Sequence, residues 1–158
     1  DWASAAELNV NITRNLSGVS EGRQRVVYVD SDADNSMKLA ADGDINTYWR
    51  TVHNQFYLAP YPHEIQVSLA KEAKVKGIKY TPRQDSAEGR IAKYEIYLSQ
   101  DGKEWGKAVA SGTFKNSKEA QTVEFTPHQA RYVKLQALSA ADGGKQAAVS
   151  ELEILTAE

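Results

Sequence analysis

A chain of 158 residues is long enough to fold around one complete hydrophobic core, and its length favours a single domain. Hydrophobic residues make up 41% and charged residues 25%, which is typical of globular proteins and argues against disorder in the body of the chain. The net charge of −2 leaves no basic face for nucleic acid or anionic membrane, and the absence of cysteine excludes disulfides, thiol nucleophiles and thiolate metal sites.

The N-terminal residues differ from the rest of the chain. They are rich in asparagine, serine and glycine, and they predict an extension or connector over residues 1–22, ahead of a main domain over residues 23–158. Residues 4–10 (Ser-Ala-Ala-Glu-Leu-Asn-Val) echo residues 148–154 (Ala-Val-Ser-Glu-Leu-Glu-Ile). Two interpretations stay open: residues 1–10 end a preceding module of the same kind, or the match is coincidence.

Short runs of alternating apolar and polar residues fill the main domain. Turn residues such as Asp101-Gly102 bound these runs, which is typical of half-buried antiparallel strands. A short helix is expected only around residues 34–41. The runs are residues 26–29, 65–69, 75–80, 94–99, 122–125, 132–137 and 151–154. The pattern predicts an all-β sandwich or barrel of Greek-key type and not an α/β enzyme.

The stretch from Ala41 to Trp49 (Ala-Asp-Gly-Asp-Ile-Asn-Thr-Tyr-Trp) contains the densest chemical pattern. Asp42 and Asp44 flank a glycine that permits a tight turn, and the Thr47 hydroxyl follows. Ca²⁺ prefers six to eight oxygen ligands, and a turn supplies carbonyl as well as side-chain oxygens. Glu151 completes such a shell if the last strand returns beside this loop. The alternative is an ordinary Asp-Gly turn.

Several motifs occur in an order that resembles the discoidin domains, also called coagulation factor V/VIII C-type domains. The similarity is greatest to the family 32 carbohydrate-binding modules of bacterial glycoside hydrolases. It covers roughly residues 26–155. The motifs are Ala41-Asp42-Gly43-Asp44-x-x-Thr47-x-Trp49, Pro62-His63-Glu64-Ile65-Gln66-Val67-Ser68-Leu69, Tyr80-Thr81-Pro82-Arg83-Gln84-Asp85, Gly89-Arg90-Ile91, Tyr94-Glu95-Ile96-Tyr97-Leu98-Ser99-x-Asp101-Gly102-x-x-Trp105, Ala130-Arg131-Tyr132-Val133-Lys134-Leu135 and Ser150-Glu151-Leu152.

The resemblance implies an antiparallel, jelly-roll-like β-sandwich with about eight main strands. It also implies a structural calcium ion that pins the acidic loop to the terminal strand. Its ligands would be Asp42, Thr47, the neighbourhood of Asp44, a carbonyl near Leu39, and Glu151. No catalysis is implied, because an ion saturated by protein oxygens has no open position for an activated water.

The resemblance further implies a sugar site on loops at one end of the sandwich. Arg83 matches the family's sugar-binding arginine, whose fork donates to two adjacent hydroxyls, and Asp85 lies beside it. An ion pair of Arg83 with Asp85 or Glu88 is the alternative. On the facing loop, His53 and Asn54 are candidates for further hydroxyl contacts, although an exposed loop position is an equal alternative for His53.

One departure from the family pattern concerns the stacking aromatic. Modules that bind galactose-type sugars usually carry an aromatic just before the last strand, but residues 141–148 here contain none. Phe56 or Tyr57 could substitute for it. Trp2 occupies the equivalent place in the echoed N-terminal segment and would belong to a preceding module. Trp49 and Trp105 are expected in the core, and His63 and His128 at the surface.

These observations predict a non-catalytic carbohydrate-binding module that targets a parent glycoside hydrolase to glycans. The expected partners are a galactose-, N-acetylglucosamine- or fucose-type glycan and a catalytic domain in the same chain, without nucleic acid or membrane insertion. The resemblance implies a secreted, periplasmic or cell-surface location in a bacterium. The alternative is an adhesion module of the same fold, which would expose an apolar patch. An independent enzyme is disfavoured, because no nucleophile elbow, zinc histidine pair or phosphate loop appears.

Overall fold

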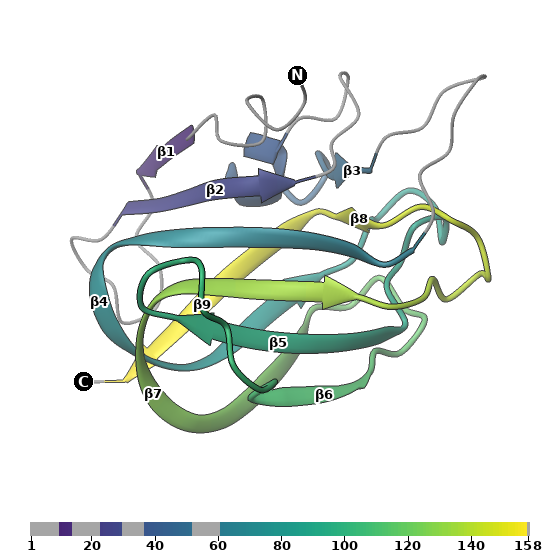
Figure 1. Ribbon diagram of the computed structural model, residues 1–158. Coiled ribbons are helices and arrows are strands. Elements are labelled where there is room, and N and C mark those ends of the chain that lie inside the picture. Colours follow the sequence, from purple (N-terminus) through teal and green to yellow (C-terminus); the bar gives the residue numbers. More distant parts are fainter. Residues whose placement is uncertain (1–9, 14–22, 30–36, 52–60, 158) are drawn as a thin grey trace.

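The computed structural model describes residues 10–13, 23–29, 37–51 and 61–157, which form an antiparallel β-sandwich (Figure 1). This confirms the predicted all-β, jelly-roll-like class. The elements in chain order are β1 (Val10–Thr13), β2 (Arg23–Val29), the 3₁₀ helix η1 (Met37–Ala41), β3 (Trp49–Arg50), β4 (His63–Thr81), β5 (Lys93–Ser99), β6 (Ala110–Thr113), β7 (Gln121–Ala137), β8 (Ala148–Val149) and β9 (Glu151–Ala157). No helix in these ranges is long and apolar enough to span a bilayer.

Two long, bent strands build both layers of the sandwich. The first half of β4 pairs with β2 and with the second half of β7, which in turn pairs with β5. The second half of β4 pairs with the first half of β7 and with β9. Because both strands fold back on themselves, one continuous hydrogen-bond ladder passes from one layer into the other. A separate two-stranded ladder joins β3 to β8.

The core lies between these layers and is built by alternation along each strand. On β4, for example, Ile65 and Val67 point inward while Glu64 and Gln66 are only partly buried. Trp49 is 1% exposed, which confirms its expected place in the core. The largest fully buried side chains are Trp49, Tyr80, Ile65, Leu69, Ile78, Ile91, Ile96, Leu135, Leu152 and Ile154.

The observed strands differ from the predicted ones in four places. The runs 65–69 and 75–80 are one strand, β4, and the runs 122–125 and 132–137 are one strand, β7. Strand β6 was not predicted, because its residues are mostly exposed and carry no apolar alternation. Strand β1 lies inside the segment assigned to a connector, and it pairs with β2 in register Val10 to Val26. The helix expected around residues 34–41 is described as η1 over Met37–Ala41.

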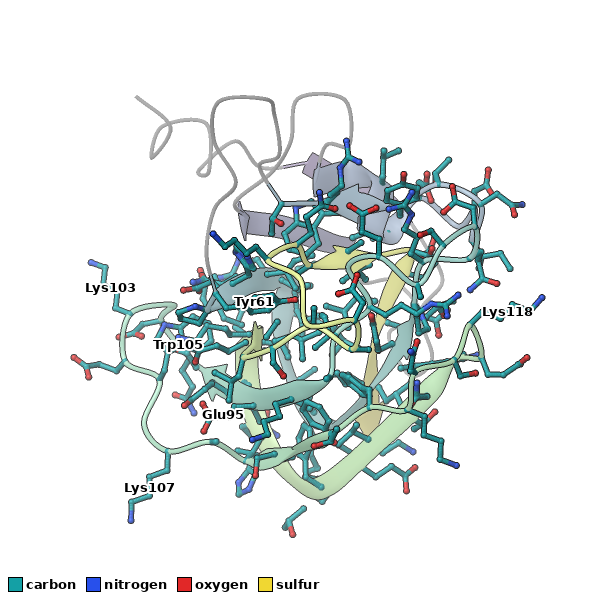
Figure 2. The ribbon with its side chains drawn as sticks, turned by 90° about the vertical axis from the view of Figure 1, so that its right-hand side faces the viewer. Tyr61, Glu95, Lys103, Trp105, Lys107 and Lys118 are labelled. Carbon is teal, nitrogen blue, oxygen red and sulfur yellow. The ribbon has the colours of Figure 1, made fainter. Side chains whose placement is uncertain are left out.

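The strand register defines two ends of the sandwich. The Arg83 end comprises residues 82–92, 114–120 and 138–147, which connect strands at the edge marked by the pair Tyr94 and Ala137. The Trp105 end comprises residues 100–109 and the bends of β4 and β7, beyond the pair Ser99 and Tyr132. The Arg83 end is at the right of Figure 1 and faces the reader in Figure 2.

Tyr80 ties the sheet to the loops of the Arg83 end. Its buried hydroxyl donates to the carbonyl of Ala148 over 3.3 Å and accepts from the backbone nitrogen of Ile91 over 3.1 Å. Burial raises its pKa far above the usual range, so the phenol stays protonated. The hydroxyl therefore joins β4, the loop before β5 and β8.

Replacing Tyr80 by phenylalanine should lower the free energy of unfolding by about 1–3 kcal/mol, because the buried Ile91 nitrogen loses the hydroxyl to which it donates. Tyr97→Phe is the matched control, since its hydroxyl bonds to Glu95 and is not part of the core. Thermal unfolding followed by circular dichroism measures both. Equal melting temperatures for the two variants would show that the Tyr80 hydroxyl does not hold these loops.

Candidate functional site

Arg83 follows β4 and is held on two sides at the Arg83 end. Its Nε donates to Oδ1 of Asp85 over 2.6 Å, and its guanidinium carbon lies 4.3 Å from the ring centroid of Tyr48. The carbonyl of Arg83 accepts from Nε of Arg90 over 3.0 Å. The guanidinium plane is therefore fixed by a charge-assisted hydrogen bond and a cation–π contact.

The Arg83 side chain is more buried than a residue on the edge of a binding site is expected to be. It is 10% exposed, whereas the carboxylate of Asp85 is 64% exposed. The ion pair with Asp85 is the alternative that the sequence left open, and it is formed. However, Nη1 of Arg83 is buried and has no hydrogen-bond partner among the residues that the structure describes. A buried donor without a partner costs about 1–3 kcal/mol, so this nitrogen is a donor that a further acceptor would stabilise.

The charges of this pair are stable at neutral pH. Burial alone would lower the pKa of Arg83, but the hydrogen bond to Asp85 and the contact with Tyr48 outweigh it, so the pKa is raised. The hydrogen bond from Arg83 lowers the pKa of Asp85. Because the pKa of Asp85 is lowered, the ion pair is fully formed at any pH above the ordinary pKa of an aspartate. It is lost only as the pH falls through the lowered pKa.

The other predicted sugar contacts lie between β3 and Tyr61 in the sequence. His53, Asn54, Phe56 and Tyr57 lie outside the described residues, so their predicted roles stay predictions. The described flank of this loop is Tyr61, whose hydroxyl donates to the carbonyl of Gln146 over 2.5 Å. The loop before the last strands is thereby tied to the loop that follows β3.

His63 was expected at the surface, and this is wrong. It begins β4, is 3% exposed, and its Nε2 lies 2.7 Å from the carbonyl oxygen of Lys145. Tyr61 packs edge-on against its ring at 4.5 Å between centroids. The period-two pattern of β4 places position 63 on the inward face, because Ile65 and Val67 point inward. His128, by contrast, is exposed as expected.

Gln146 is a polar residue that sequence reasoning missed. It is 3% exposed, and both polar atoms of its carboxamide are buried without a hydrogen-bond partner in the ranges described above. It lines a cavity of about 350 Å³ between residues 86–89 and residues 142–146. The sequence gives only a weak indication that Gln146 is buried, namely the small residues Ala147 and Ala148 that follow it and indicate close packing.

Gly89 sets the spacing between these two loops. Its φ is +84°, a left-handed conformation that favours glycine, and an added Cβ would lie 2.9 Å from the Cβ of Ala148. Its carbonyl accepts from the nitrogen of Ala148 over 2.8 Å. The segment 86–89 is therefore packed directly on β8, beside the loop that lacks an aromatic.

The acidic loop between η1 and β3 brings together the residues predicted to bind calcium. Oδ1 of Asp42 accepts from the nitrogen of Asp44 over 2.9 Å, and the Thr47 hydroxyl lies 2.5 Å from Oδ2 of Asp42 and 3.0 Å from the carbonyl oxygen of Asp44. Oε1 of Glu151, the first residue of β9, accepts from the nitrogen of Gly43 over 2.6 Å. The last strand thus returns beside this loop.

These groups fit a hard oxygen-ligated cation. Glu151 is 3% exposed, and its carboxylate accepts a hydrogen bond from Gly43, the residue next to Asp42. Within the described parts of the chain, no three Asp, Glu, His or Cys side chains form a metal-binding group, so hydroxyl and carbonyl oxygens must complete the shell. Thr47, the carbonyl of Asp44 and the carbonyl near Leu39, in η1, are the candidates. This donor set suits Ca²⁺ and not a transition metal.

Trp105 was expected in the core, and this is also wrong. It is only partly buried, on the loop between β5 and β6 at the Trp105 end. The ammonium of Lys134, on the outer face of β7, lies 4.5 Å from its ring centroid. The turn at Asp101-Gly102 ends the inward alternation of β5, so the periodicity of that strand does not extend to position 105.

A loop-built polar site at one end of a disulfide-free β-sandwich is typical of small binding modules. The F5/8 type C domain profile matches residues 24–152, and the chain belongs to this family. The chain is 36% identical to a sialidase of Micromonospora viridifaciens over 155 residues, which is 96% of the chain but 24% of that protein. It is 30% identical to a galactose oxidase of Gibberella zeae over 142 residues, or 89% of the chain and 21% of that protein.

Solved structures agree with this family assignment. The family 32 carbohydrate-binding module of Clostridium perfringens NanJ, in complex with galactose, has a TM-score of 0.72 and 30% identity over 93% of this chain and 98% of that one. Another Clostridium perfringens module, from a family 31 glycoside hydrolase, has a TM-score of 0.77 and 27% identity over 85% of this chain and 91% of that one. The chain is therefore a discoidin-type domain whose solved neighbours are non-catalytic carbohydrate-binding modules.

Proposed function

We propose that this chain is a carbohydrate-binding module that holds galactose-type sugars at the Arg83 end. The observation that carries the proposal is the arrangement of Arg83. Its guanidinium is fixed by Asp85 and Tyr48 and still has a buried nitrogen without a partner in the described part of the chain. Two adjacent sugar hydroxyls present the acceptors that such a fork requires.

The remaining sugar contacts are proposed on the loop that faces Arg83. His53 and Asn54 would bond further hydroxyls, and Phe56 or Tyr57 would stack on the apolar face of the sugar, because residues 141–148 offer no aromatic ring. Galactose is favoured over N-acetylglucosamine and fucose, because solved neighbours were determined with galactose and with GalNAc-beta-1,3-galactose.

We propose further that the acidic loop binds a structural calcium ion through Asp42, Thr47, Glu151 and the carbonyls of Asp44 and Leu39. The ion would neutralise the carboxylates of Asp42 and Glu151, which accept from the neighbouring backbone nitrogens of Asp44 and Gly43. Its role would be to fix the loop to β9. Tyr48 directly follows Thr47, so this loop also carries the ring that contacts Arg83.

The parent protein is proposed to be a glycoside hydrolase that acts outside the cell or at its surface. The chain spans about a quarter of the length of the sialidase that it matches, so a catalytic domain elsewhere in the parent chain accounts for the remainder. A module of this kind keeps the enzyme close to its glycan by raising the effective concentration.

An adhesion module is less well supported. It predicts an exposed apolar patch, but in the ranges that the structure describes the exposed large hydrophobic side chains are Ile45 and Leu138. Ile45 belongs to the acidic loop and Leu138 follows β7. Isolated exposed side chains are normal on a folded surface and give no reason to place a protein partner there.

The test is a glycan array with the 158-residue chain in the presence of calcium, followed by calorimetric titration of the strongest neutral hit and of methyl β-galactoside. Signal concentrated on terminal galactose or N-acetylgalactosamine is expected. Signal confined to glucose- or mannose-terminated glycans would contradict the galactose assignment. A chain that binds no glycan, while its circular dichroism shows a folded β-protein, would contradict the function.

Asp85 is expected to position Arg83 for the sugar. Replacing Asp85 by asparagine removes the charged acceptor from Nε, and it should weaken sugar binding about three- to fivefold, the scale of an exposed ion pair. Glu119→Gln, which removes an exposed carboxylate at the same end, is the matched control. Calorimetric titration of methyl β-galactoside measures both. Identical affinities would show that the Asp85 charge is irrelevant to the sugar.

A further inference from the structure

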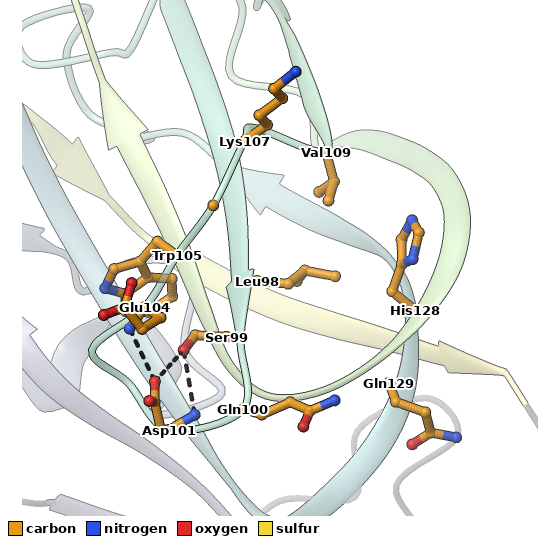
Figure 3. A pocket seen from close by; sticks show the side chains of 11 residues that line it. Leu98, Ser99, Gln100, Asp101, Glu104, Trp105, Lys107, Val109, His128 and Gln129 are labelled. Carbon is orange, nitrogen blue, oxygen red and sulfur yellow. Dashed lines mark hydrogen bonds between the residues drawn. The ribbon is translucent and has the colours of Figure 1, made fainter.

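The Trp105 end contains a cavity of about 750 Å³ that the function proposed above does not use (Figure 3). It lies between the loop after β5 and the bend of β7, at the far end of the sheet from Arg83. Figure 1 shows the loop between β5 and β6 and the bend of β7 at the left, away from the Arg83 end at the right. Its lining residues are Leu98, Ser99, Gln100, Asp101, Glu104, Trp105, Gly106, Lys107, Val109, His128 and Gln129.

The loop that carries Trp105 is held in one conformation by its own hydrogen bonds. Oδ1 of Asp101 accepts from the nitrogens of Lys103 and Glu104 over 2.8 and 2.9 Å, and from the Ser99 hydroxyl over 3.0 Å. These bonds lower the pKa of Asp101, so it stays a carboxylate at neutral pH. The Ser99 oxygen in turn accepts from the nitrogen of Gly102 over 2.9 Å. The wall of the cavity is thus preorganised.

The indole of Trp105 is fixed as well, and it remains partly exposed. The ammonium of Lys134 lies 4.5 Å from its ring centroid and 4.9 Å from that of Tyr97. Lys134 belongs to β7, so its cation–π contacts with these two rings hold the indole of Trp105 against the sheet. A partly exposed tryptophan with a fixed ring loses little conformational entropy when a flat apolar surface stacks on it.

The chemistry of the lining selects a class of ligand. Leu98 and Val109 supply an apolar surface, which in Figure 3 lies on the side of His128, away from Trp105. The side-chain amides of Gln100 and Gln129 supply both donors and acceptors. Two carboxylates and one ammonium group give a net charge of −1 with His128 neutral, which disfavours phosphates, sialic acids and uronic acids.

We propose that the cavity at the Trp105 end is a second binding site, for a neutral disaccharide or longer glycan. A pyranose ring presents an apolar face for the indole and hydroxyls for the amides. The volume falls within the range of about 300–1,000 Å³ for small-molecule sites. With sites at opposite ends, one copy of the chain bridges two separate glycan chains, because its two sites cannot both contact the same flat surface.

The test follows the backbone and indole N–H signals of the ¹⁵N-labelled chain by NMR during titration with lactose, N-acetyllactosamine, chitobiose and cellobiose. At least one probe should produce saturable shifts at the Trp105 indole and at Gln129. Trp105→Ala should remove these shifts. Because that change can also loosen the loop, the exposed replacement Gln129→Ala is the second variant, and it should weaken binding at this site severalfold.

Two variants separate this site from the sugar site proposed above. Arg83→Ala should leave the Trp105 shifts unchanged, so the second site survives even if the Arg83 site proves silent. Lys103→Ala, an exposed change in the same loop but outside the lining, should have no effect. Shifts at the Trp105 end that vanish with Arg83→Ala would overturn the proposal, and so would the absence of any saturable shift there with all four probes.

Discussion

Replacing Arg83 by alanine is expected to weaken the binding of galactose-type sugars by at least about tenfold. A hydrogen bond from a charged donor contributes about 1.5–3 kcal/mol, and about 1.4 kcal/mol corresponds to a factor of ten in affinity. The substitution removes a guanidinium whose buried Nη1 lacks a partner among the described residues. Calorimetric titration of methyl β-galactoside into the wild-type chain and the variant measures the loss directly.

Two controls make this result specific. Arg83→Lys keeps the positive charge but loses the planar fork, so it should lose nearly as much affinity as the alanine variant. Arg131→Ala removes an arginine that donates to the carbonyl of Leu69, near the bend of β4, and should leave affinity unchanged. Melting temperatures are compared first, because Arg83 is buried. A folded Arg83→Ala chain that binds sugar like the wild type would refute the site.

The strand pattern could be predicted because burial alternates with period two wherever a strand has one face in the core. Residues 65–69 and 75–80 show this alternation, and both lie in β4. The link between them could not be predicted. Residues 70–72 are exposed, so the alternation ends there, although β4 continues through a register shift against β7 between Ser68 and Ala73. Strand β6 was missed for the same reason, since its exposed residues pair with β5 only through their backbone.

The candidate site was predictable where a short motif carries the chemistry. The Arg83 and Asp85 pair is close in sequence, and the acidic turn meets Glu151 because the last strand returns to it. Gln146 was not predictable, since its burial depends on loops that meet only in the folded chain, whereas the alternation of β4 places His63 on the inward face. Trp105 was misplaced because its residue type favours the core, whereas its loop lies outside the alternation of β5.

Tyr48 connects the two parts of the proposed function. It directly follows Thr47, a proposed calcium ligand, and its ring lies 4.3 Å from the guanidinium carbon of Arg83. A cation that fixes Thr47 therefore also fixes the aromatic face that holds the sugar-binding arginine. Calcium would thus act on sugar affinity through the position of Tyr48, without touching the sugar.

Calcium is accordingly expected to raise the melting temperature by about 5–10 °C over the calcium-free chain. A ligand at 100 times its dissociation constant stabilises the native state by about 2.7 kcal/mol, and about 1 kcal/mol shifts the melting temperature of a chain of this size by about 2–4 °C. Chelation should reverse the shift and also weaken galactose binding severalfold. Differential scanning calorimetry with added Ca²⁺, Mg²⁺ or chelator measures the first effect, and calorimetric titration measures the second.

Glu151→Gln tests whether this stabilisation comes from the acidic loop. The amide oxygen can still accept from the nitrogen of Gly43, so the fold is kept, but the charge that a hard cation requires is gone. The variant should melt at the same temperature with and without calcium. Glu153→Gln, two residues along the same strand, should respond like the wild type. A calcium shift that survives in Glu151→Gln would place the ion elsewhere, and the link through Tyr48 to Arg83 would then be lost with it.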